Sequence, residues 1–280
     1  MSIEVLVLGR AQDAGMPHAG CSCRHCASAI AGQVPREFAA SLAIVDRDLN
    51  QSWLIDAGPD FREQLFFLQQ RYPKTKLAGI LITHAHVGHY TGLIHLGREA
   101  MNSKAVPIYA TPRMCDFLSG NAPWSQLISA GNIVLHKQEP ASTLAVNDHL
   151  RIAFVPVPHR DEFTDTMAFV VRGSSGALFY CPDIDSWEKW DRDVKTLPDE
   201  YGVSIIDGTF FDSGELPKHT MSAVPHPTIQ HSMQLIGDGR GQIFFTHMNH
   251  TNPLISSVEA RQDLRQKGFD VVDHGQVFEL

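Results

Sequence analysis

Short apolar segments recur along the whole chain, and most of them end at a glycine, a histidine or an aspartate. Such runs, rich in Val, Ile and Phe and closed by turn residues, predict β-strands. The strands expected are 3–9, 41–45, 52–58, 77–83, 106–110, 150–158, 166–171, 176–183, 202–208, 241–247 and 270–280. Helical periodicity is expected over 59–71, 186–196, 225–238 and 254–267. Mostly antiparallel strands with single helices between them predict an α/β fold of four layers, an αββα sandwich with two sheets face to face and helices outside.

The 280 residues are expected to form one domain, 1–280, because no repeat, low-complexity tract or Pro/Gly/Ser linker divides them. Hydrophobic residues make up 43% of the chain and charged residues 19%, as in globular proteins with a sizeable core. The net charge of −8 and the lack of a Lys/Arg cluster argue against a nucleic-acid partner. We therefore expect a small-molecule substrate.

The sequence also predicts no membrane association. No stretch approaches the roughly 20 apolar residues that span a bilayer, and the start, MSIEVLVLGRAQDAG, lacks a basic leader. A cytoplasmic location is expected. Whether the chain is a monomer or a homodimer stays open.

Histidines crowd directly behind one expected strand, in the motif THAHVGH, as His84, His86 and His89. In an extended segment His84 and His86 face the same side, and His89 can turn back toward them as a helix begins. Polar residues close later strands in the same way, namely His159, Asp183, Asp207 and His247. Any one of these histidines alone would be interpreted as solvent-exposed, or as buried with its hydrogen bonds made inside the core. Because strand ends meet at one edge of a sheet, the whole set instead predicts a metal site.

A second motif, CSCRHC, places Cys21, Cys23 and Cys26 within six residues. Disulfide geometry fits such close neighbours poorly, whereas three thiolates suit a tetrahedral metal that needs a fourth ligand. His25, inside the motif, is too constrained to join its own neighbours. Free reduced cysteines near the surface are the alternative. Two further cysteines, at 115 and 181, are expected to be buried as small hydrophobic residues.

THAHVGH resembles the HxHxDH signature of the metallo-β-lactamase superfamily, and His159, Asp183 and His247 match the later ligands of that family in order. Three further segments are GRAQDAGMPHAGCSCRHC, IIDGTFFDSGEL and HMNHTNPL. They resemble the pyrroloquinoline quinone biosynthesis protein B family and the related cyclic phosphodiesterases of phosphonate breakdown. The resemblance covers nearly the whole chain.

The resemblance implies a ligand set. His84, His86 and His159 would hold one metal, His89 and His247 a second, and the carboxylate of Asp183 would bridge the two. Glycine at position 88 is a departure, because the family has a ligating aspartate there. One negative charge is lost, so we expect one firmly held ion and a second that is weak, exchangeable or different in kind, with Zn²⁺, Mn²⁺ and Fe²⁺ as candidates. On this view Gly88→Asp should raise the occupancy of the second site.

Other roles follow partly from the resemblance and partly from the position of the residues in the sequence. In the phosphodiesterase relative an H-x-x-H pair sends its second histidine to a structural metal, so HMNH implies that His250 completes a structural Zn²⁺ site with the three cysteines. His226 matches a histidine that faces the substrate and would donate a proton or bind an oxyanion, with a solvent-facing position at a helix start as the alternative. Asp207 would orient a ligating histidine or simply close its strand. For Asp13 and His18 a surface-loop role is favoured over a place beside the pocket.

The leading interpretation is a metal-dependent hydrolase of a small phosphodiester, ester or lactone, with Asp183 orienting a metal-activated water. A second is an iron-dependent oxygenase of cofactor biosynthesis that uses His89, Asp183 and His247, with the missing aspartate leaving room for oxygen or substrate. A third is a binding or carrier protein whose site has decayed.

Overall fold

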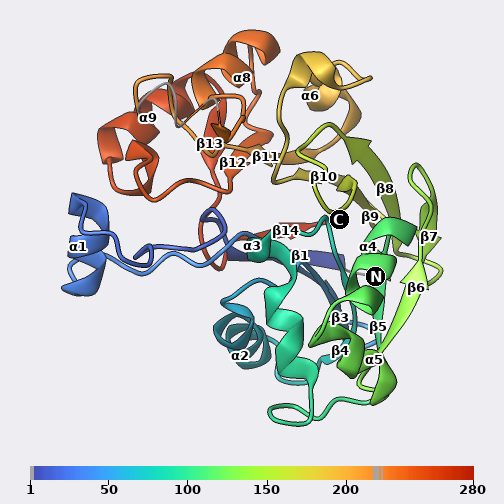
Figure 1. Cartoon of the computed structure of the whole chain (residues 1–280). Coiled ribbons are helices and arrows are strands. Elements are labelled where there is room, and N and C mark those ends of the chain that lie inside the picture. Colours follow the sequence, from blue (N-terminus) through green and yellow to red (C-terminus); the bar gives the residue numbers. More distant parts are fainter. Residues whose placement is uncertain (1–2, 217–220, 222) are drawn as a thin grey trace.

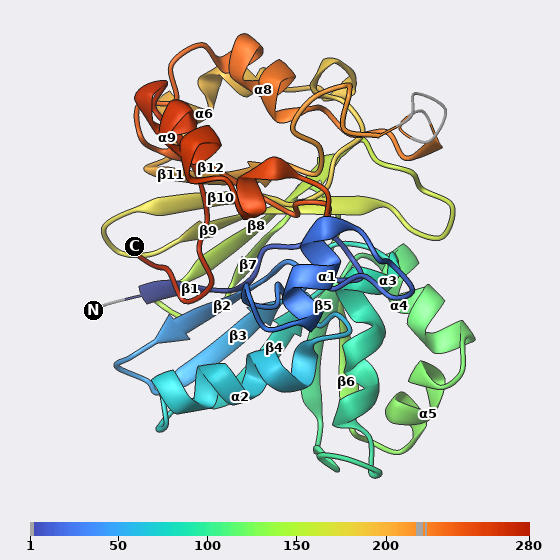
Figure 2. The same cartoon turned by 90° about the vertical axis from the view of Figure 1, so that its left-hand side faces the viewer.

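The computed structural model describes residues 3–216, 221 and 223–280, and within them the chain forms two seven-stranded sheets packed face to face (Figures 1 and 2). The first sheet has the order β14-β1-β2-β3-β4-β5-β6, and the second β13-β12-β11-β10-β9-β8-β7. The strands of the first are β1 (Ile3–Gly9), β2 (Ser41–Asp46), β3 (Gln51–Ile55), β4 (Lys76–Leu81), β5 (Val106–Ala110), β6 (Ile133–Lys137) and β14 (Val277–Glu279). Those of the second are β7 (Thr143–Ala145), β8 (Arg151–Val157), β9 (Thr166–Arg172), β10 (Ala177–Cys181), β11 (Val203–Asp207), β12 (Ile243–Thr246) and β13 (Phe269–Val271).

Helices cover the outer face of each sheet (Figure 2). On the first sheet they are α2 (Phe61–Arg71), α3 (Val87–Tyr90), the 3₁₀ turn η1 (Thr91–Leu96), α4 (Pro112–Gly120) and α5 (Trp124–Ser129). On the second they are η2 (Trp187–Lys189), η3 (Val194–Thr196), α6 (Leu197–Glu200), α8 (Ile229–Ile236), η4 (Pro253–Ile255) and α9 (Val258–Gln266). A further helix, α1 (Arg24–Ile30), lies beside the C-terminal segment around η4. The predicted αββα sandwich is confirmed.

The core explains why the strands read as almost continuous apolar runs. In β1 every residue is buried, because Val5 and Val7 pack between the sheets while Leu6 and Leu8 pack against the helices. A strand covered on both faces needs apolar side chains at every position rather than at alternate ones.

Several sequence expectations were wrong. The strands are not mostly antiparallel, because β3 to β6 and β10 to β13 pair in parallel. No continuous helix spans 186–196. The side chains of Ser186 and Asp193 each cap a separate short 3₁₀ turn, and the backbone between the two turns is not helical. The segment 270–280 divides into β13 and β14, which belong to different sheets. Within the described residues, seven elements were not predicted, namely α1, α4, α5, α6, η1, β6 and β7.

The parallel strands set the position of the site. Their carboxyl ends lie at one edge of the sandwich, where Asp56 follows β3, the histidine motif follows β4, and Asp183 follows β10. Asp207 closes β11 and His247 follows β12. Backbone at this edge is bent tightly, with Asp56 at φ 66° and His247 at φ 59°, in the left-handed region that few non-glycine residues occupy. In the described residues no helix is long and apolar enough to cross a bilayer.

Candidate metal centre

Three histidines and one aspartate meet at this edge, as the first group of expected ligands. Nδ1 of His86 lies 2.8 Å from Nε2 of His84 and 3.0 Å from Nε2 of His159. Oδ2 of Asp183 lies 3.3 Å from Nε2 of His84 and 3.2 Å from Nε2 of His159. Ligand atoms around a tetrahedral zinc with bonds of about 2.0–2.1 Å are separated by roughly 3.3 Å. The four atoms therefore have the spacing of one coordination shell.

A second group lies on the other side of the Asp183 carboxylate. Nε2 of His89 is 3.8 Å from Asp183 Oδ2, and Nε2 of His247 is 3.9 Å from the same oxygen. Asp13 completes this group, with its Oδ1 at 3.4 Å from Nε2 of His89 and 3.7 Å from Nε2 of His247. Oδ2 of Asp183 is thus the atom that both groups share.

Hydrogen bonds at the outer ring nitrogens hold these imidazoles in place. Nδ1 of His89 donates to Asp56 at 2.7 Å, and Nδ1 of His159 donates to Asp185 at 2.8 Å. Two threonine hydroxyls receive the others: Thr83 lies 3.0 Å from His84, and Thr209 lies 2.9 Å from His247. A donor bond at Nδ1 leaves the lone pair on Nε2, and this is the usual arrangement of metal-ligating histidines. His86 is turned the other way, with Nε2 at 3.3 Å from Glu162.

Among the residues that the structure describes, the inner atoms of the cluster have no hydrogen-bond partners although they are buried. This holds for Oδ1 of Asp13, Oδ1 of Asp183 and the Nε2 atoms of His89, His226 and His247. Leaving a buried polar atom unpaired costs roughly 1–3 kcal/mol, so five such atoms facing one centre need a common partner. A divalent cation fits this donor set, since imidazole nitrogen and carboxylate oxygen are zinc, manganese and ferrous-iron ligands.

The surroundings of the cluster keep Asp183 and His84 in the deprotonated forms that bind a metal, but they favour a proton on His89. Burial opposes ionisation of Asp183, but the neighbouring His159, His247 and His226 hold the pKa of its carboxyl well below the ordinary value. Burial and the adjacent His89 lower the pKa of His84, which keeps its ring neutral. Conversely, Asp56 and Asp13 outweigh burial and raise the pKa of His89. A cation at His89 would therefore have to displace a proton.

His226, expected to face the substrate, lies inside the cluster rather than in solvent. Its Nδ1 is 2.7 Å from Oδ2 of Asp207 and 3.3 Å from Oδ1 of Asp183. Burial alone would lower the pKa of His226, but the negative charges of Asp207 and Asp183 have the larger effect and raise this pKa to about 9. Asp207 is itself fully buried and also accepts from the backbone and hydroxyl of Thr209. It thus orients His226 directly, and through Thr209 it orients His247.

Gly88 does not leave the gap that the sequence suggested. A Cβ built there would collide with Oδ1 of Asp13 and would lie 2.5 Å from the Cα of Asp13. The space in which the family's aspartate side chain would begin is filled by another segment of this chain. Two expectations are therefore no longer supported. One is that a negative charge is missing from the second group, and the other is that the missing aspartate makes room for oxygen or substrate. The expected gain from Gly88→Asp also fails, because an aspartate there has no space.

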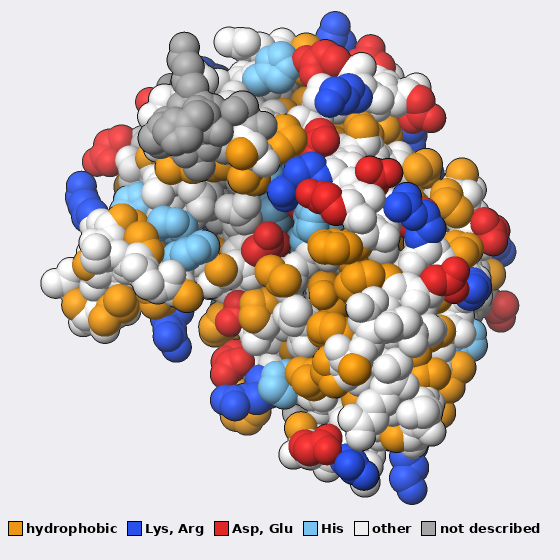
Figure 3. Space-filling view, viewed as in Figure 1, with side chains coloured by type: hydrophobic (Ala, Val, Ile, Leu, Met, Phe, Trp, Pro, Cys, Tyr) orange, Lys and Arg blue, Asp and Glu red, His pale blue; other side chains and the backbone are white. Residues whose placement is uncertain are grey.

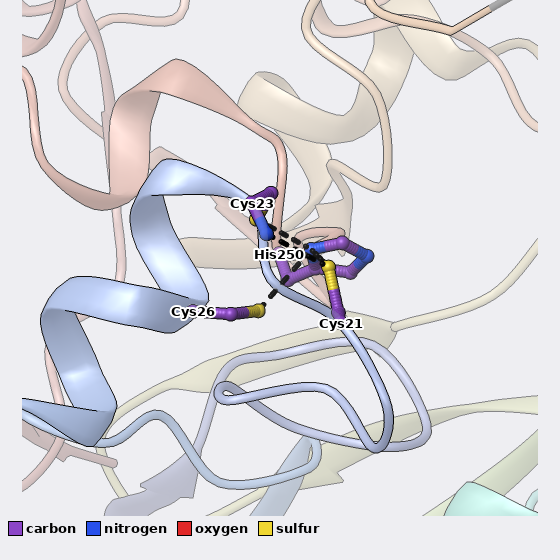
Figure 4. A group of neighbouring side chains, drawn as sticks. All are labelled: Cys21, Cys23, Cys26 and His250. Atoms are coloured by element: carbon purple, nitrogen blue, oxygen red, sulfur yellow. Dashed lines mark hydrogen bonds between the residues drawn. The ribbon is translucent and has the colours of Figure 1, made fainter.

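The cysteine motif lies apart from this cluster, against the C-terminal segment (Figure 4). Nδ1 of His250 is 3.5 Å from the sulfurs of Cys23 and Cys26 and 3.9 Å from that of Cys21. For a zinc with bonds of about 2.3 Å to sulfur and 2.0 Å to nitrogen, a separation of roughly 3.5 Å is expected. His25 points elsewhere, with Nδ1 at 2.8 Å from the carbonyl oxygen of His250. Cys115 and Cys181 are both buried in the apolar core, as expected.

Replacing His250 with alanine is expected to release the metal of the cysteine site. The ligand set ties residues 21–26 to residue 250, so its loss should resemble that of a disulfide closing a long loop, about 2–5 kcal/mol of unfolding free energy. Metal content and Tm measure both effects. His25→Ala is the matched control and should keep the ion. An unchanged metal content in His250→Ala would show that the fourth ligand is a different group.

A pocket of about 490 Å³ opens beside the cluster, lined by His86, Asp13 and Arg160 together with aromatic side chains. The aromatic residues are Tyr90, Phe117, Trp124 and Phe163. On this face hydrophobic side chains gather over α3 and α4, next to histidines in a central hollow (Figure 3). The volume falls in the range of small-molecule sites, roughly 300–1,000 Å³.

Several residues of the site were missed by sequence reasoning. Asp56 follows the apolar residues at the start of LIDAG, just as Asp207 follows those of SIIDG. The pattern that indicated Asp207 would therefore also have indicated Asp56. Thr83 precedes His84, and Asp185 lies two residues after Asp183. Which of these nearby side chains contacts an imidazole ring depends on the path of the loop. Nothing in the sequence marks Arg160 as a pocket residue.

The fold and the histidine-carboxylate cluster define a class of protein. The family described as "Beta-lactamase superfamily domain" matches residues 52–266. The chain therefore belongs to the metallo-β-lactamase superfamily.

Among individual relatives, Coenzyme PQQ synthesis protein B of Acinetobacter baumannii (strain ACICU) is 22% identical, over 99% of this chain and 100% of that protein. Its counterpart from Methylobacterium sp. (strain 4-46) is 26% identical, with the same shares covered. Zn²⁺-bound PqqB from Methylobacterium extorquens superposes with a TM-score of 0.82 at 21% identity, over 99% of this chain and 100% of that chain. A diphosphatase from the PhnP family superposes with a TM-score of 0.71 at 22% identity, over 100% and 98%. The two structures support the fold.

Proposed function

We propose that this protein is a metal-dependent hydrolase of a small molecule, with a phosphodiester, an ester or a lactone as the scissile group. One observation carries the proposal: His84, His86, His159 and Asp183 converge with the spacing of one coordination shell, beside a pocket that His86 lines. A cation held there would lower the pKa of a bound water toward neutrality. Zn²⁺, Mn²⁺ and Fe²⁺ all suit the donor set.

Two side chains have further roles in the proposed reaction. Oδ1 of Asp183 is buried and has no hydrogen-bond partner, so it accepts a hydrogen bond from the attacking water and fixes the direction of its lone pair. Nε2 of His226 is likewise buried and unpaired, while Nδ1 is held by Asp207. Because the pKa of His226 is raised to about 9, the ring carries a proton on both nitrogens near neutral pH. His226 therefore presents a positioned N–H at Nε2, which donates to the leaving group or to a developing oxyanion.

The pocket favours a substrate with a flat apolar part and a negative charge. Tyr90 packs between Phe117 and Trp124, with ring centroids 5.4 and 4.8 Å apart, and forms one wall. Arg160 lines the same pocket, and its buried Nε has no hydrogen-bond partner. A guanidinium with a free donor recognises a phosphate or a carboxylate. No role for a nucleic acid follows from this pocket, which is of small-molecule size.

A second candidate is an iron-dependent oxygenase of cofactor biosynthesis, and the name of the Coenzyme PQQ synthesis relatives supports only the cofactor-biosynthesis part of it. His89, His247 and Asp183 would form the two-histidine, one-carboxylate set that such enzymes use. Its earlier support from an open position at Gly88 no longer holds, because Asp13 lies there.

The two candidates are separated by metal and by co-substrate. The protein is loaded anaerobically with Zn²⁺, Mn²⁺ or Fe²⁺ and tested on bis(p-nitrophenyl) phosphate, p-nitrophenyl acetate and a homoserine lactone, with oxygen consumption followed in parallel. We expect hydrolysis of at least one probe with Zn²⁺ or Mn²⁺, lost by about 10³-fold or more in His159→Ala. His149→Ala, at the opposite end of β8, should retain it. Oxygen uptake with Fe²⁺ alone, and no hydrolysis with any metal, would favour the oxygenase.

A further inference from the structure

Asp13 lies in the loop between β1 and α1, more than 70 residues before the histidine motif, yet its carboxylate reaches the metal cluster. The loop is fixed on both sides by backbone hydrogen bonds: the N–H of Gln12 donates to the carbonyl of Met248, and the N–H of Gly15 donates to that of Gln12. Its position is therefore tied to the segment that carries His247.

Glycine at position 88 is what allows this approach. A Cβ there would collide with Oδ1 of Asp13 and lie 2.9 Å from its Cγ, so the carboxylate of residue 13 occupies the place where a side chain at 88 would begin. The backbone is closely packed on its other side as well, because a Cβ at Gly58 would collide with the carbonyl of Gly88. The helix α3 thus accepts no side chain at 88 while the loop of Asp13 stays in place.

The carboxylate of Asp13 also faces groups that require a partner. Its Oδ1 and the Nε2 atoms of His89 and His247 are all buried, and none has a hydrogen-bond partner in the described part of the chain. Both histidines are 1% exposed, and their outer nitrogens are already engaged by Asp56 and Thr209. The inner nitrogens of both rings therefore converge with a carboxylate oxygen at 3.4 and 3.7 Å.

We propose that Asp13 is a ligand of a second metal ion and replaces, from a different segment of the chain, the aspartate that the HxHxDH signature would place at position 88. The second shell then consists of Asp13, His89, His247 and the shared carboxylate of Asp183. This set carries the same charge as the signature's own, so no negative charge is missing from the second site. The proposal depends on the metal cluster of the proposed function but not on the reaction assigned to it.

Metal content of the purified full-length protein tests the proposal without an activity assay. After loading with Zn²⁺ and removal of free metal, the wild-type chain should hold about three ions, one in the cysteine site and two in the cluster. Asp13→Ala should lose one of them, and titration should show the second ion weakened by more than the roughly 10–100-fold that loss of an orienting partner causes. Gln12→Ala is the matched control from the same loop and should keep all three.

A second variant tests the geometry without removing a ligand. Gly88→Ala adds only a methyl group, which has to push Asp13 away, so it should also lose the second ion while Asp13 and both histidines remain. Anomalous scattering at the zinc edge identifies the site that is lost. If Asp13→Ala and Gly88→Ala both fold, as judged by Tm, and both keep two ions in the cluster, Asp13 is not a ligand. If the wild-type chain binds no ion in the cluster at all, the proposed function fails as well, and the two failures are thereby distinguished.

Discussion

Replacing Asp183 with asparagine is expected to weaken both metals of the cluster at once and to lower hydrolytic activity by about 10³-fold or more. Its Oδ2 lies 3.2–3.9 Å from five ligand nitrogens that belong to the two groups. Asparagine keeps the shape of the side chain but removes the charge that both ions share. The measurements are metal content and the increase in Tm on adding Zn²⁺, which follows the affinity of the folded state for the ion.

Asp185 supplies the matched control, two residues away on the same loop. Its carboxylate contacts Nδ1 of His159 and not the inner nitrogens. Asp185→Asn should therefore reduce activity or metal affinity only by the roughly 10–100-fold typical of an orienting partner. Equal losses in the two variants would contradict the bridging position of Asp183. Full retention of both ions in Asp183→Asn would remove Asp183 from the ligand set altogether.

The fold could be predicted because its strands are covered on both faces. Continuous apolar runs that end at polar residues fixed the existence and approximate bounds of most strands, including β1, β5 and β9. Sequence reasoning failed where an element is short or half exposed. For example, β6 and β7 lie at sheet edges and alternate only weakly, with exposed residues at most positions. The parallel pairing was also missed, because local pattern carries no direct information on which strands become neighbours.

The candidate site could be predicted as far as it follows strand ends. Most residues of the expected ligand set lie within a few residues of a strand end, and a sheet brings such positions to one edge; His89 instead lies in α3, the short helix after β4. Asp13 does not follow this rule, because it reaches the cluster from a loop whose path depends on contacts with Met248 and Gly88. The absent aspartate was therefore visible in the sequence, whereas the carboxylate that fills its place was visible only in three dimensions.

The two halves of the sandwich support the cluster in the same way. Asp56 accepts hydrogen bonds from the backbone and the hydroxyl of Thr83, and it accepts a third from Nδ1 of His89. The oxygen of Thr83 in turn accepts a hydrogen bond from His84. Asp207 does the same in the other half, through Thr209 for His247 and directly for His226. One buried carboxylate in each half thus determines which nitrogen of two imidazoles faces the metal.

Asp56→Asn is expected to remove the second metal while leaving the fold almost unchanged. Oδ1 of residue 56 must still accept from the backbone N–H of Thr83 at 2.8 Å, so the amide NH₂ takes the position of Oδ2, 2.7 Å from Nδ1 of His89. An NH₂ group donates, and this forces the proton of His89 onto Nε2, where the lone pair for the metal would otherwise be. Asparagine also tolerates the left-handed backbone at φ 66°.

Asp56→Ala separates this tautomer effect from a loss of structure. It leaves the buried N–H of Thr83 and the ring of His89 without an acceptor, and alanine is disfavoured at the left-handed φ. A loss of about 3–5 kcal/mol in unfolding free energy is expected, as when one partner of a buried pair is removed. Chemical denaturation of the metal-free proteins measures stability, and zinc titration measures the second site. Because the cysteine site is remote from Asp56, its ion should remain in both variants. If Asp56→Asn binds the second ion as tightly as the wild-type chain, the proton on His89 is not set by Asp56, and the orientation of this ring must come from its packing alone.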